Sequence, residues 1–471
     1  MTDIELHPDR LFPTDPSVRS IARRLYDEVA GLPIISPHGH VDPAILAEDQ
    51  PFGDPANLLV VPDHYVTRLL HAHGVSFDSL GVPPGAPRGD ASPREIWRTF
   101  CSHWWAFRGT PSRYWLEAEL VDVFGVHLRP SADTADELFD QLSERLAAPE
   151  FRPRALYERF GIEVLATTDD PTDDLAAHRK LADDAAWKGR VVPTFRPDPY
   201  LEPARPDWPA RVARLGEVTG EDTTGYAGYV AALEQRRAYF KRNGATATDH
   251  GHADAGSEPL EPAEASRIYA AALTGAATPE EATAFRRHMF TEMARMASED
   301  GLVMQVHPGV LRDHHTGTFD RYGRDVGGDI PMTTEYTRSL RPLLERYGTH
   351  PNFRMVLFTV DEDVFSREIA PLAGFYPSVF VGAPWWFIDT PDAIRRFREA
   401  VTDTVGFHKT AGFVDDTRAY CSIPVRHDMA RRLDCGFLAR LVAEHRLPED
   451  EAADTAADLA YRLPASTFRV A

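Results

Sequence analysis

The sequence predicts an α/β protein, and specifically a (β/α)8 barrel, from three observations. Short apolar, β-rich runs alternate with longer charged segments typical of helices, and the runs end abruptly in polar clusters. The length of 471 residues also accommodates a single barrel with insertions. Strands that alternate with helices pair in parallel, and reactive residues gathered after strand ends are typical of the C-terminal face of such a barrel.

Eight strands are expected along the chain. The clearest apolar runs are residues 32–36, 163–166, 191–195, 302–306, 355–358, 378–381 and 412–414. The remaining strand is placed near residues 244–248, before Asp249, where the apolar signal is weak. A tail around residues 448–461 is acidic and rich in alanine, which predicts a surface helix.

One segment, residues 83–151, does not follow the barrel period. It concentrates the large aromatics Trp97, Phe100, Trp104, Trp105, Phe107, Tyr114 and Trp115. We interpret it as a helical insertion whose aromatic side chains form its own core rather than a ligand cage. The predicted organisation is therefore an N-terminal segment with the first strand (1–82), the insertion (83–151), and the rest of the barrel with C-terminal helices (152–471).

Composition and charge restrict the classes of partner. A net charge of −21 disfavours nucleic acid and anionic membranes, because the field of the protein repels phosphate. The sequence contains no apolar run long enough for a membrane span and no signal-peptide core at its N-terminus. Its three cysteines are widely spaced, which predicts reduced thiols and a cytoplasmic location. An anionic small substrate remains compatible if arginines gather at its site.

The first predicted strand ends in His38-Gly39-His40, which has the pattern of half a metal site. Residues i and i+2 of an extended strand face the same side, so both imidazoles can reach one ion. Two imidazoles suit zinc, manganese or iron. The alternative is a pair of loop histidines that binds nothing.

A carboxylate partner for this pair follows the last predicted strand. In a closed barrel the last and first strands are neighbours, so Asp416 is expected beside His38 and His40. Two imidazoles and a carboxylate make a three-ligand site with open positions, which can bind and polarise a substrate or water. The alternative for Asp415-Asp416 is a solvated loop or a helix cap.

The segment Asp63-His64-Tyr65 combines three side chains that can transfer protons. Tyrosine is a poor base at neutral pH, but a metal or arginine close by can lower its pKa. The alternative is that Asp63 caps a helix that begins near His64, while Tyr65 packs against its own scaffold.

Several further residues near predicted strand ends are candidates for substrate binding. Arg196, Arg312 and Arg418 each lie at or shortly after such an end, where the guanidinium fork could hold a carboxylate. His307 lies at a similar position, as a substrate hydrogen-bond donor or a further metal ligand. Any single arginine could instead be a surface ion-pair partner.

A set of motifs occurs in a specific order over nearly the whole chain. They are Asp63-His64-Tyr65, Thr167-Thr168-Asp169-Asp170-Pro171, Arg196-Pro197-Asp198, Gln305-Val306-His307-Pro308-Gly309, Trp385-Trp386-Phe387, and Asp416-Thr417-Arg418 with Arg426-His427 downstream. In these motifs the chain resembles the uronate isomerase (glucuronate isomerase) family, the hexuronate-isomerising branch of the amidohydrolase superfamily.

This resemblance implies a distorted (β/α)8 barrel and one divalent metal held by His38, His40 and Asp416. It further implies that D-glucuronate is isomerised to D-fructuronate and D-galacturonate to D-tagaturonate. By the same matching, the substrate pocket would be lined by Tyr65, Arg196, His307, Arg312, Trp386 and Arg418. Departures such as Thr417, where the family often has serine, leave the choice between the two sugars open.

The expected chemistry is proton transfer between carbons 1 and 2 of the open-chain sugar through an enediol. Tyr65 is favoured as the carbon-2 base, and His64 or Asp416 is expected to assist ring opening. Zinc is the first choice of metal, with manganese or iron as alternatives. The aromatic insertion is a candidate contact surface for a homo-oligomer.

Two other functions remain as alternatives. The first is a metal-dependent hydrolase of the same superfamily that attacks an amide, ester or lactone. It is disfavoured because no lysine follows a middle strand, where a ligand bridging two metals would be needed. The second is a non-catalytic protein that binds sugar acids, which would leave the open metal positions unexplained.

Overall fold

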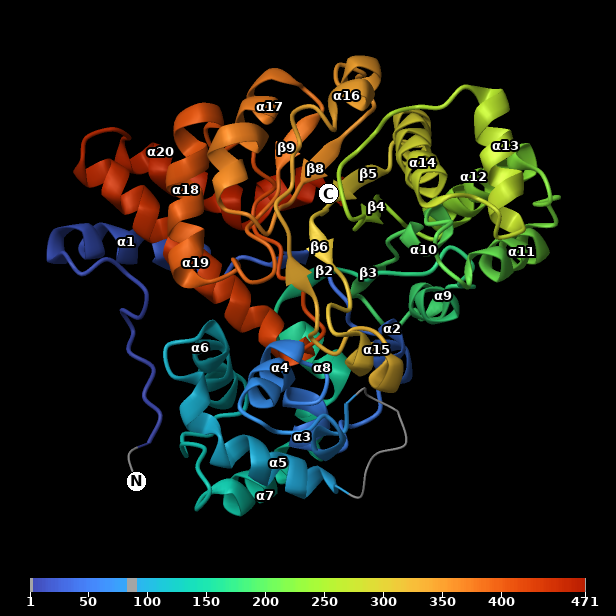
Figure 1. Cartoon of the computed structure of the whole chain (residues 1–471). Coiled ribbons are helices and arrows are strands. Elements are labelled where there is room, and N and C mark those ends of the chain that lie inside the picture. Colours follow the sequence, from blue (N-terminus) through green and yellow to red (C-terminus); the bar gives the residue numbers. More distant parts are fainter. Residues whose placement is uncertain (1–2, 83–90, 471) are drawn as a thin grey trace.

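The parallel strands of the computed structural model follow one another in the order of a barrel (Figure 1). The structure describes residues 3–82 and 91–470. One parallel sheet contains β1 (Ile34–Ser36), β2 (Ile162–Ala166) and β3 (Arg190–Val192). A second contains β4 (Ala247–His250), β5 (Val303–Val306), β8 (Met355–Leu357) and β9 (Val379–Val381). A parallel bridge between Phe195 and Thr248 joins the two sheets.

Residues 410–417 close the ring between β9 and β1. Thr410 forms a parallel bridge with Val381, and the His40 N–H donates to the Thr417 carbonyl at 2.9 Å. The last strand was expected at residues 412–414, but this segment forms no regular ladder. Gly412 has a φ of +74°, which interrupts an extended strand. The prediction of an α/β, distorted (β/α)8 barrel is confirmed, and the weak strand before Asp249 is present as β4.

A layer of helices lies between β1 and β2 in the sequence and below the barrel in Figure 1. It contains α2 (Pro43–Glu48), α3 (Pro55–Leu59), α4 (His64–Ala72), α5 (Pro93–Ser102), α6 (Pro111–Ala118), α7 (Ala135–Leu146) and α8 (Pro153–Arg159). Helices inserted after the first strand are therefore confirmed. The layer begins with α2, before the predicted bounds 83–151, which stay a prediction, and residues 83–90 lie outside the described residues.

The aromatic side chains of this layer do not form a separate core. Trp97, Phe100, Trp104 and Trp115 are buried in one apolar cluster that continues into the barrel strands β1 and β2. The expectation of a private core is therefore wrong, because the layer packs directly against the first half of the barrel. Among these aromatics Trp105 is half exposed.

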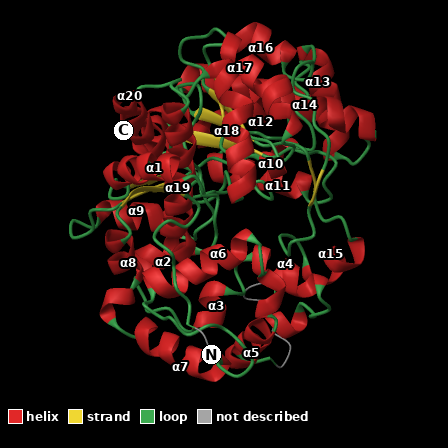
Figure 2. Ribbon diagram, turned by 90° about the vertical axis from the view of Figure 1, so that its left-hand side faces the viewer, coloured by secondary structure: helices red, strands yellow, loops and turns green. Residues whose placement is uncertain are grey.

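The remaining helices surround the barrel (Figure 2). They are α1 (Pro16–Val29), α9 (Ala176–Asp183), α10 (Asp198–Leu201), α11 (Trp208–Thr219), α12 (Tyr226–Arg242), α13 (Pro262–Leu273), α14 (Pro279–Asp300), α15 (Thr316–Tyr322), α16 (Arg341–Tyr347), α17 (Ala370–Phe375), α18 (Pro391–Val405), α19 (Ile423–Ala443), α20 (Glu449–Ala457) and α21 (Leu463–Thr467). Short 3₁₀ helices lie at Asp78–Leu80, Trp104–Phe107, Pro149–Phe151 and Tyr420–Ser422, and π-helical turns at Glu119–Val123, Phe365–Ile369 and Asp458–Arg462.

Local sequence explains where these elements begin and end. The longest helix, α14, starts with a capping box between Thr278 and Glu281 and ends before Gly301, whose φ is +78°. A short antiparallel pair, β6 (Val310–Leu311) and β7 (Ile330–Pro331), holds the long loop after β5. That loop carries α15, which reaches the helical layer through an ion pair between Arg321 and Asp78.

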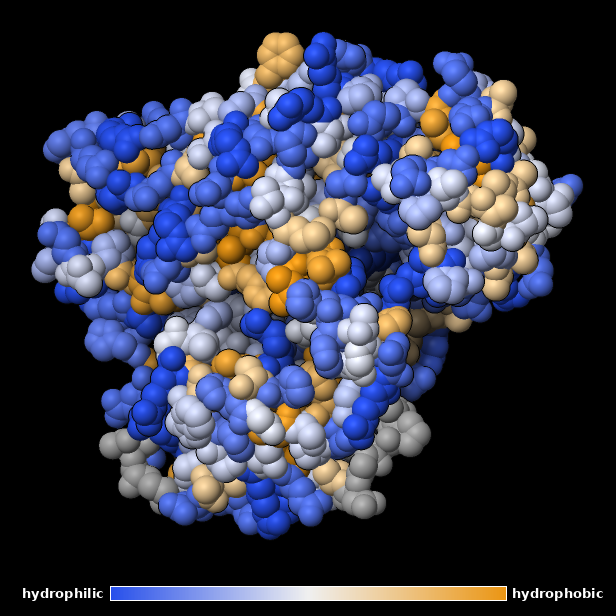
Figure 3. All heavy atoms as spheres, in the orientation of Figure 1, coloured by the Kyte–Doolittle hydropathy of each residue, from blue (hydrophilic) through white to orange (hydrophobic). Residues whose placement is uncertain are grey.

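The outer surface of the molecule is largely polar. The face in Figure 3 is mostly hydrophilic, with apolar residues gathered toward its centre. Within residues 3–82 and 91–470, no helix combines the length and the apolar character that crossing a membrane requires.

Candidate metal centre and substrate pocket

Three of the sequence-predicted ligands converge where the barrel closes. Asp416 Oδ1 lies 3.3 Å from His38 Nε2 and 3.1 Å from His40 Nε2. The three ligand atoms all lie within 4.8 Å of one another. Asp416 Oδ1 is buried and has no hydrogen-bond partner among the described residues. Two imidazole nitrogens and one carboxylate oxygen at one point are a donor set that fits a divalent cation such as zinc.

The local backbone explains why these atoms meet. Gly39 passes so close to the last segment of the barrel that a Cβ there would lie 3.4 Å from the Thr417 carbonyl oxygen. Asp416 has a φ of +41°, an uncommon conformation for a residue with a side chain, and such positions cluster at functional sites. The Trp385 indole N–H donates to Asp416 Oδ2, which leaves Oδ1 facing the two histidines.

A second group of polar side chains extends this cluster. Asp249, at the end of β4, forms a hydrogen bond with His307 Nε2 and lies 3.9 Å from His38 Nδ1. Arg196 Nε is 3.4 Å from the other oxygen of Asp249. Burial raises the pKa of Asp249, but the charges of His307, Arg196 and His38 lower it well below its usual value. Asp249 therefore joins His307 and Arg196 to the metal cluster.

Sequence reasoning did not select Asp249 or Trp385 as site residues. Asp249 follows the strand with the weakest apolar signal, so its position at a strand end was the one available indication. Trp385 precedes Trp386, and the structure places both beside the cluster. Trp385 bonds Asp416 and packs against His307 with ring centroids 4.6 Å apart.

The Tyr65 hydroxyl group forms two hydrogen bonds, one as a donor and one as an acceptor. Its hydroxyl donates to Asp389 Oδ1 at 2.7 Å and accepts the Phe387 N–H at 3.0 Å. The other Asp389 oxygen accepts a bond of 2.9 Å from Arg426. The residues Trp385–Asp389 after β9 thus contact both Tyr65 and Asp416. Phe387 has a φ of +65°, a second strained position in the site.

The pKa of Tyr65 moves in the direction opposite to the sequence expectation. Burial and the Asp389 carboxylate raise it well above its usual value, although Arg426 acts to lower it. The expected cation is present, since the Arg426 guanidinium lies 5.5 Å from the centre of the Tyr65 ring. The Arg426 guanidinium is paired with the Asp389 carboxylate. The negative charge of Asp389 therefore offsets most of the effect of Arg426 on the Tyr65 hydroxyl group.

The structural alternative for Asp63-His64-Tyr65 is also present. Asp63 is the N-cap of α4, and its carboxylate accepts the Tyr65 N–H at 2.8 Å. This cap directs the first turn of α4 toward the site. The His64 ring stacks on Tyr65 at 5.4 Å between centroids and meets Trp386 edge-on at 5.5 Å. Burial and Arg418 lower the pKa of His64 to about 3, so His64 is neutral at pH 7.

The three candidate arginines gather around one acidic residue. Arg418 lies 3.5 Å from Asp325, and Arg312 stacks on Trp386 at 5.6 Å. Burial raises the pKa of Asp325, but Arg418, Arg312 and Arg196 together lower it below its usual value. The arginines also have individual partners, because Arg312 bonds Asp329 at 2.8 Å and Arg196 bonds Asp198 at 3.2 Å.

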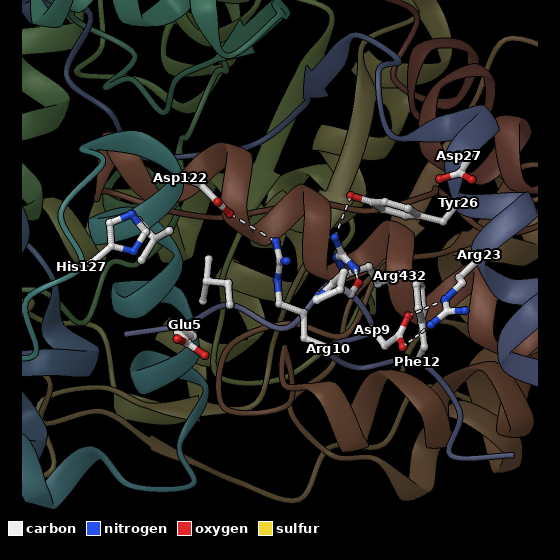
Figure 4. A pocket seen from close by; sticks show the side chains of 13 residues that line it. Glu5, Asp9, Arg10, Phe12, Arg23, Tyr26, Asp27, Asp122, His127 and Arg432 are labelled. Carbon is white, nitrogen blue, oxygen red and sulfur yellow. Dashed lines mark hydrogen bonds and ion pairs between the residues drawn. The ribbon is translucent and has the colours of Figure 1, made fainter. Parts of the chain in front are cut away.

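A cavity of about 520 Å³ borders the metal cluster. It is lined by residues that include His40, Thr168, Asp169, His178 and Arg418. A larger cavity of about 710 Å³ lies between α1, α19 and the N-terminal segment, away from the cluster (Figure 4). Several of its charged side chains pair with one another, as in Arg10 with Asp122 at 3.2 Å. Of the proposed site residues, His40 and Arg418 line the smaller cavity.

Asp169, on the wall of the smaller cavity, provides a pH-dependent test of this geometry. Burial raises the pKa of Asp169 to about 7, although hydrogen bonds from Thr167 and the Thr194 N–H act to lower it. A carboxyl group whose pKa is raised by folding stabilises the fold below its unfolded pKa, and this contribution is lost as the pH rises toward 7. The full loss is at most about 4 kcal/mol.

The Asp169→Asn variant keeps both hydrogen-bond acceptor contacts but cannot ionise. We therefore expect its free energy of unfolding, relative to the wild type, to increase between pH 4 and about pH 7 and to level off above that. Urea unfolding at several pH values measures this difference. A difference that is constant over this range would contradict the raised pKa of Asp169.

Comparisons with known proteins show similarity over nearly the whole chain. The sequence model of the glucuronate isomerase family matches residues 17–468. A uronate isomerase from Rhizorhabdus wittichii is 54% identical over 467 residues, which cover 99% of each chain. The crystal structure of a glucuronate isomerase from Caulobacter crescentus superposes with a TM-score of 0.97 at 48% identity, covering 99% of this chain and 98% of that one. A uronate isomerase structure from Thermotoga maritima superposes with a TM-score of 0.92 at 29% identity, covering 98% and 99%.

Proposed function

Since the chain belongs to the glucuronate isomerase family, it is an enzyme that isomerises hexuronates, and we propose that D-glucuronate is its first substrate. The product is then D-fructuronate, and we propose that D-galacturonate gives D-tagaturonate in the same site. The two aldoses differ at carbon 4, far from the reacting carbons. The observation that carries the proposal is the loop Trp385–Asp389, which contacts both Asp416 and Tyr65.

We assign the metal to His38, His40 and Asp416. When bound there, a divalent cation supplies polarisation of the carbonyl oxygen and a neighbouring hydroxyl oxygen of the open-chain sugar. Zinc is the first choice because two imidazoles and one carboxylate with open positions suit it, and manganese or iron fit the same donors.

Arg196, Arg312 and Arg418 are proposed to bind the substrate carboxylate and the adjacent oxygens. This assignment is supported by Asp325, because all three arginines lower the pKa of its carboxyl group and therefore lie close enough to act on a carboxylate at this position. A sugar acid bound here would take the place of the Asp325 carboxylate. Trp386 offers an apolar face beside Arg312, and His307 can form a hydrogen bond to a sugar oxygen.

Proton transfer from carbon 2 is assigned to Tyr65. Tyr65 accepts the carbon-2 proton as its own phenolic proton passes to Asp389, 2.7 Å away. The electron pair of the C–H bond forms the carbon–carbon double bond of an enediol. The reverse transfer returns a proton to carbon 1 and leaves Tyr65 and Asp389 as they began. Because the phenolic proton passes to Asp389 in this proton relay, Tyr65 can act as a base although its pKa is raised.

The oxygen-bound protons are assigned to Asp416 and His64. Asp416 is assigned the transfer of the hydroxyl proton from the oxygen of carbon 2 to that of carbon 1. His64 is neutral at pH 7, so it can accept the anomeric hydroxyl proton when the sugar ring opens. These roles make Tyr65, Asp416 and His64 the catalytic residues.

Hydrolysis in the same superfamily is not favoured. A bridging ligand for two metals is expected after a middle strand, and the lysines at positions 180, 188, 241 and 409 do not follow one. Lys409, the one beside β9, instead donates to the carbonyls of Tyr376 and Pro377. A hydrolase would also leave the paired Tyr65 and Asp389 without a role.

Product analysis tests the proposed function. The zinc-loaded protein is incubated separately with D-glucuronate, D-galacturonate and representative amide, ester and lactone substrates, and products are identified by NMR. We expect ketose from at least one uronate and no hydrolysis. Binding of a uronate without any ketose would instead favour a non-catalytic sugar-acid protein, and hydrolysis alone would favour the hydrolase.

We also propose a cytoplasmic location and a homo-oligomeric state. The first is supported by Cys101, Cys421 and Cys435, which are free and buried. For the second, the half-exposed Trp105 is the candidate contact on the helical layer.

A further inference from the structure

The mechanism leaves a second His-Gly-His sequence without a role. His250-Gly251-His252 begins at the last residue of β4, and His38-Gly39-His40 comes shortly after the end of β1. Asp198, the first residue of α10, lies beside it. One ligand atom from each of Asp198, His250 and His252 lies within 4.8 Å of the others. None of these three residues belongs to the cluster of His38, His40 and Asp416.

In each of the three side chains, one polar atom contacts another residue of the protein, and the other polar atom has no hydrogen bond. His250 Nε2 lies 3.0 Å from Thr248 Oγ1, and His252 Nδ1 lies 3.1 Å from Glu202 Oε1. Asp198 Oδ2 accepts the Gly251 N–H at 2.9 Å. Over residues 3–82 and 91–470, no hydrogen-bond partner is found for His250 Nδ1, His252 Nε2 or Asp198 Oδ1.

These unpaired atoms are buried, so their arrangement requires an explanation. His250 is fully buried and His252 is 4% exposed, and the ring of Phe290 lies edge-on to both imidazoles at 5.8 Å. A buried polar atom without a partner destabilises the fold, so three that converge are expected to share an occupant. The three atoms do not satisfy one another, since His252 Nε2 is 3.7 Å from Asp198 Oδ1, too far for a hydrogen bond.

The surrounding contacts are those that orient metal ligands. A metal-binding histidine usually bonds a carboxylate, carbonyl or similar group through its other ring nitrogen. Glu202 does this for His252, and Thr248 does it for His250. The Gly251 N–H and Arg196 engage the second oxygen of Asp198, which turns the first toward the histidines.

We propose that Asp198, His250 and His252 bind a second divalent transition-metal cation, of which zinc suits the donors best. The site lies against the substrate pocket, because a Cβ on Gly251 would approach His307 Cε1 to 2.7 Å. A cation there fixes the turn after β4 and the start of α10. Both segments contact proposed substrate-binding residues. Gly251 packs against His307, and Asp198 bonds Arg196.

Zinc stoichiometry of the full-length protein tests the proposal without any measurement of activity. Each protein is saturated with zinc, dialysed against zinc-free buffer, and analysed for metal per chain by mass spectrometry. We expect two zinc ions in the wild type, one in His252→Gln, and one in Asp416→Asn. His252→Gln retains a group that can donate to Glu202, and circular dichroism confirms that each variant is folded.

The matched control is His288→Gln, a buried histidine outside both clusters. Both His288 ring nitrogens already have partners, the Tyr226 hydroxyl at 2.7 Å and the Leu260 N–H at 3.1 Å. This variant should keep two zinc ions. One zinc in the wild type would overturn the proposal, as would a second zinc that survives in both His252→Gln and Asp198→Asn. Loss of the other zinc alone, in Asp416→Asn, tests the proposed catalytic centre separately.

Discussion

Replacement of Asp416 by Asn is expected to remove the catalytic metal and nearly all turnover. Asp416 Oδ1 is an anionic donor that lies 3.3 Å from His38 Nε2 and 3.1 Å from His40 Nε2. Even changes in the residues that orient metal ligands weaken metal binding by about 10–100-fold, and the loss of a ligand should exceed this. Without polarisation of the carbonyl, we expect kcat to fall by about 10³-fold or more.

The neighbouring carboxylate provides the control. Asp415 is buried and bonds His427 at 3.0 Å, a contact that Asn can preserve. Asp415→Asn should therefore keep the metal that Asp416→Asn loses, with zinc per chain and the ketose assay measured on both. An Asp416→Asn variant that retains both its catalytic zinc and near-normal turnover would remove this residue from the metal centre.

Replacement of Tyr65 by Phe should remove nearly all turnover and leave the metal in place. The change removes the hydroxyl that bonds Asp389 and Phe387, but it touches none of the proposed metal ligands. Loss of a general base costs about 10²–10⁴-fold, and we expect kcat to fall within this range. The unpaired Asp389 oxygen should also reduce the free energy of unfolding by about 1–3 kcal/mol.

Tyr420→Phe separates loss of catalysis from loss of stability. The Tyr420 hydroxyl is also buried and donates one hydrogen bond, to the Pro153 carbonyl at 2.9 Å. Tyr420→Phe should be destabilised by a similar amount yet remain active. Near-normal kcat in Tyr65→Phe would exclude Tyr65 as the base. Asp389→Asn tests the relay, because its activity should rise with pH when Tyr65 must lose its proton to solvent.

The barrel was predictable because its strands are short apolar runs with polar ends. Even β4, which has a weak signal, lies where the alternation required a strand. The last strand was predicted less accurately. The apolar residues 412–414 indicate an extended strand, but the backbone conformation of Gly412 interrupts it. The shared core of the helical layer and the barrel was not predictable, since side-chain burial depends on packing between distant segments.

The meeting of His38, His40 and Asp416 was predictable from barrel geometry, because closure brings the last strand beside the first. The contact of Asp389 with Tyr65 was not predictable, since Asp389 follows no strand end and is 324 positions away in the sequence. The raised pKa of Tyr65 was also not predictable, because burial and the Asp389 carboxylate raise it against the effect of Arg426. His250-Gly251-His252 was visible as a motif, but its unpaired nitrogens appear only in the folded chain.

In the proposed mechanism the carbon-2 hydrogen leaves as a proton through Tyr65, and the proton held by Tyr65 and Asp389 exchanges with solvent over many turnovers. Turnover of D-glucuronate in deuterated water, followed by NMR of both sugars, tests this step. We expect solvent deuterium at carbon 1 of D-fructuronate and at carbon 2 of recovered D-glucuronate, and neither signal in Tyr65→Phe. Ketose formed over many turnovers with no deuterium at either carbon would contradict the mechanism, because a hydride that moves directly between the two carbons never exchanges with solvent.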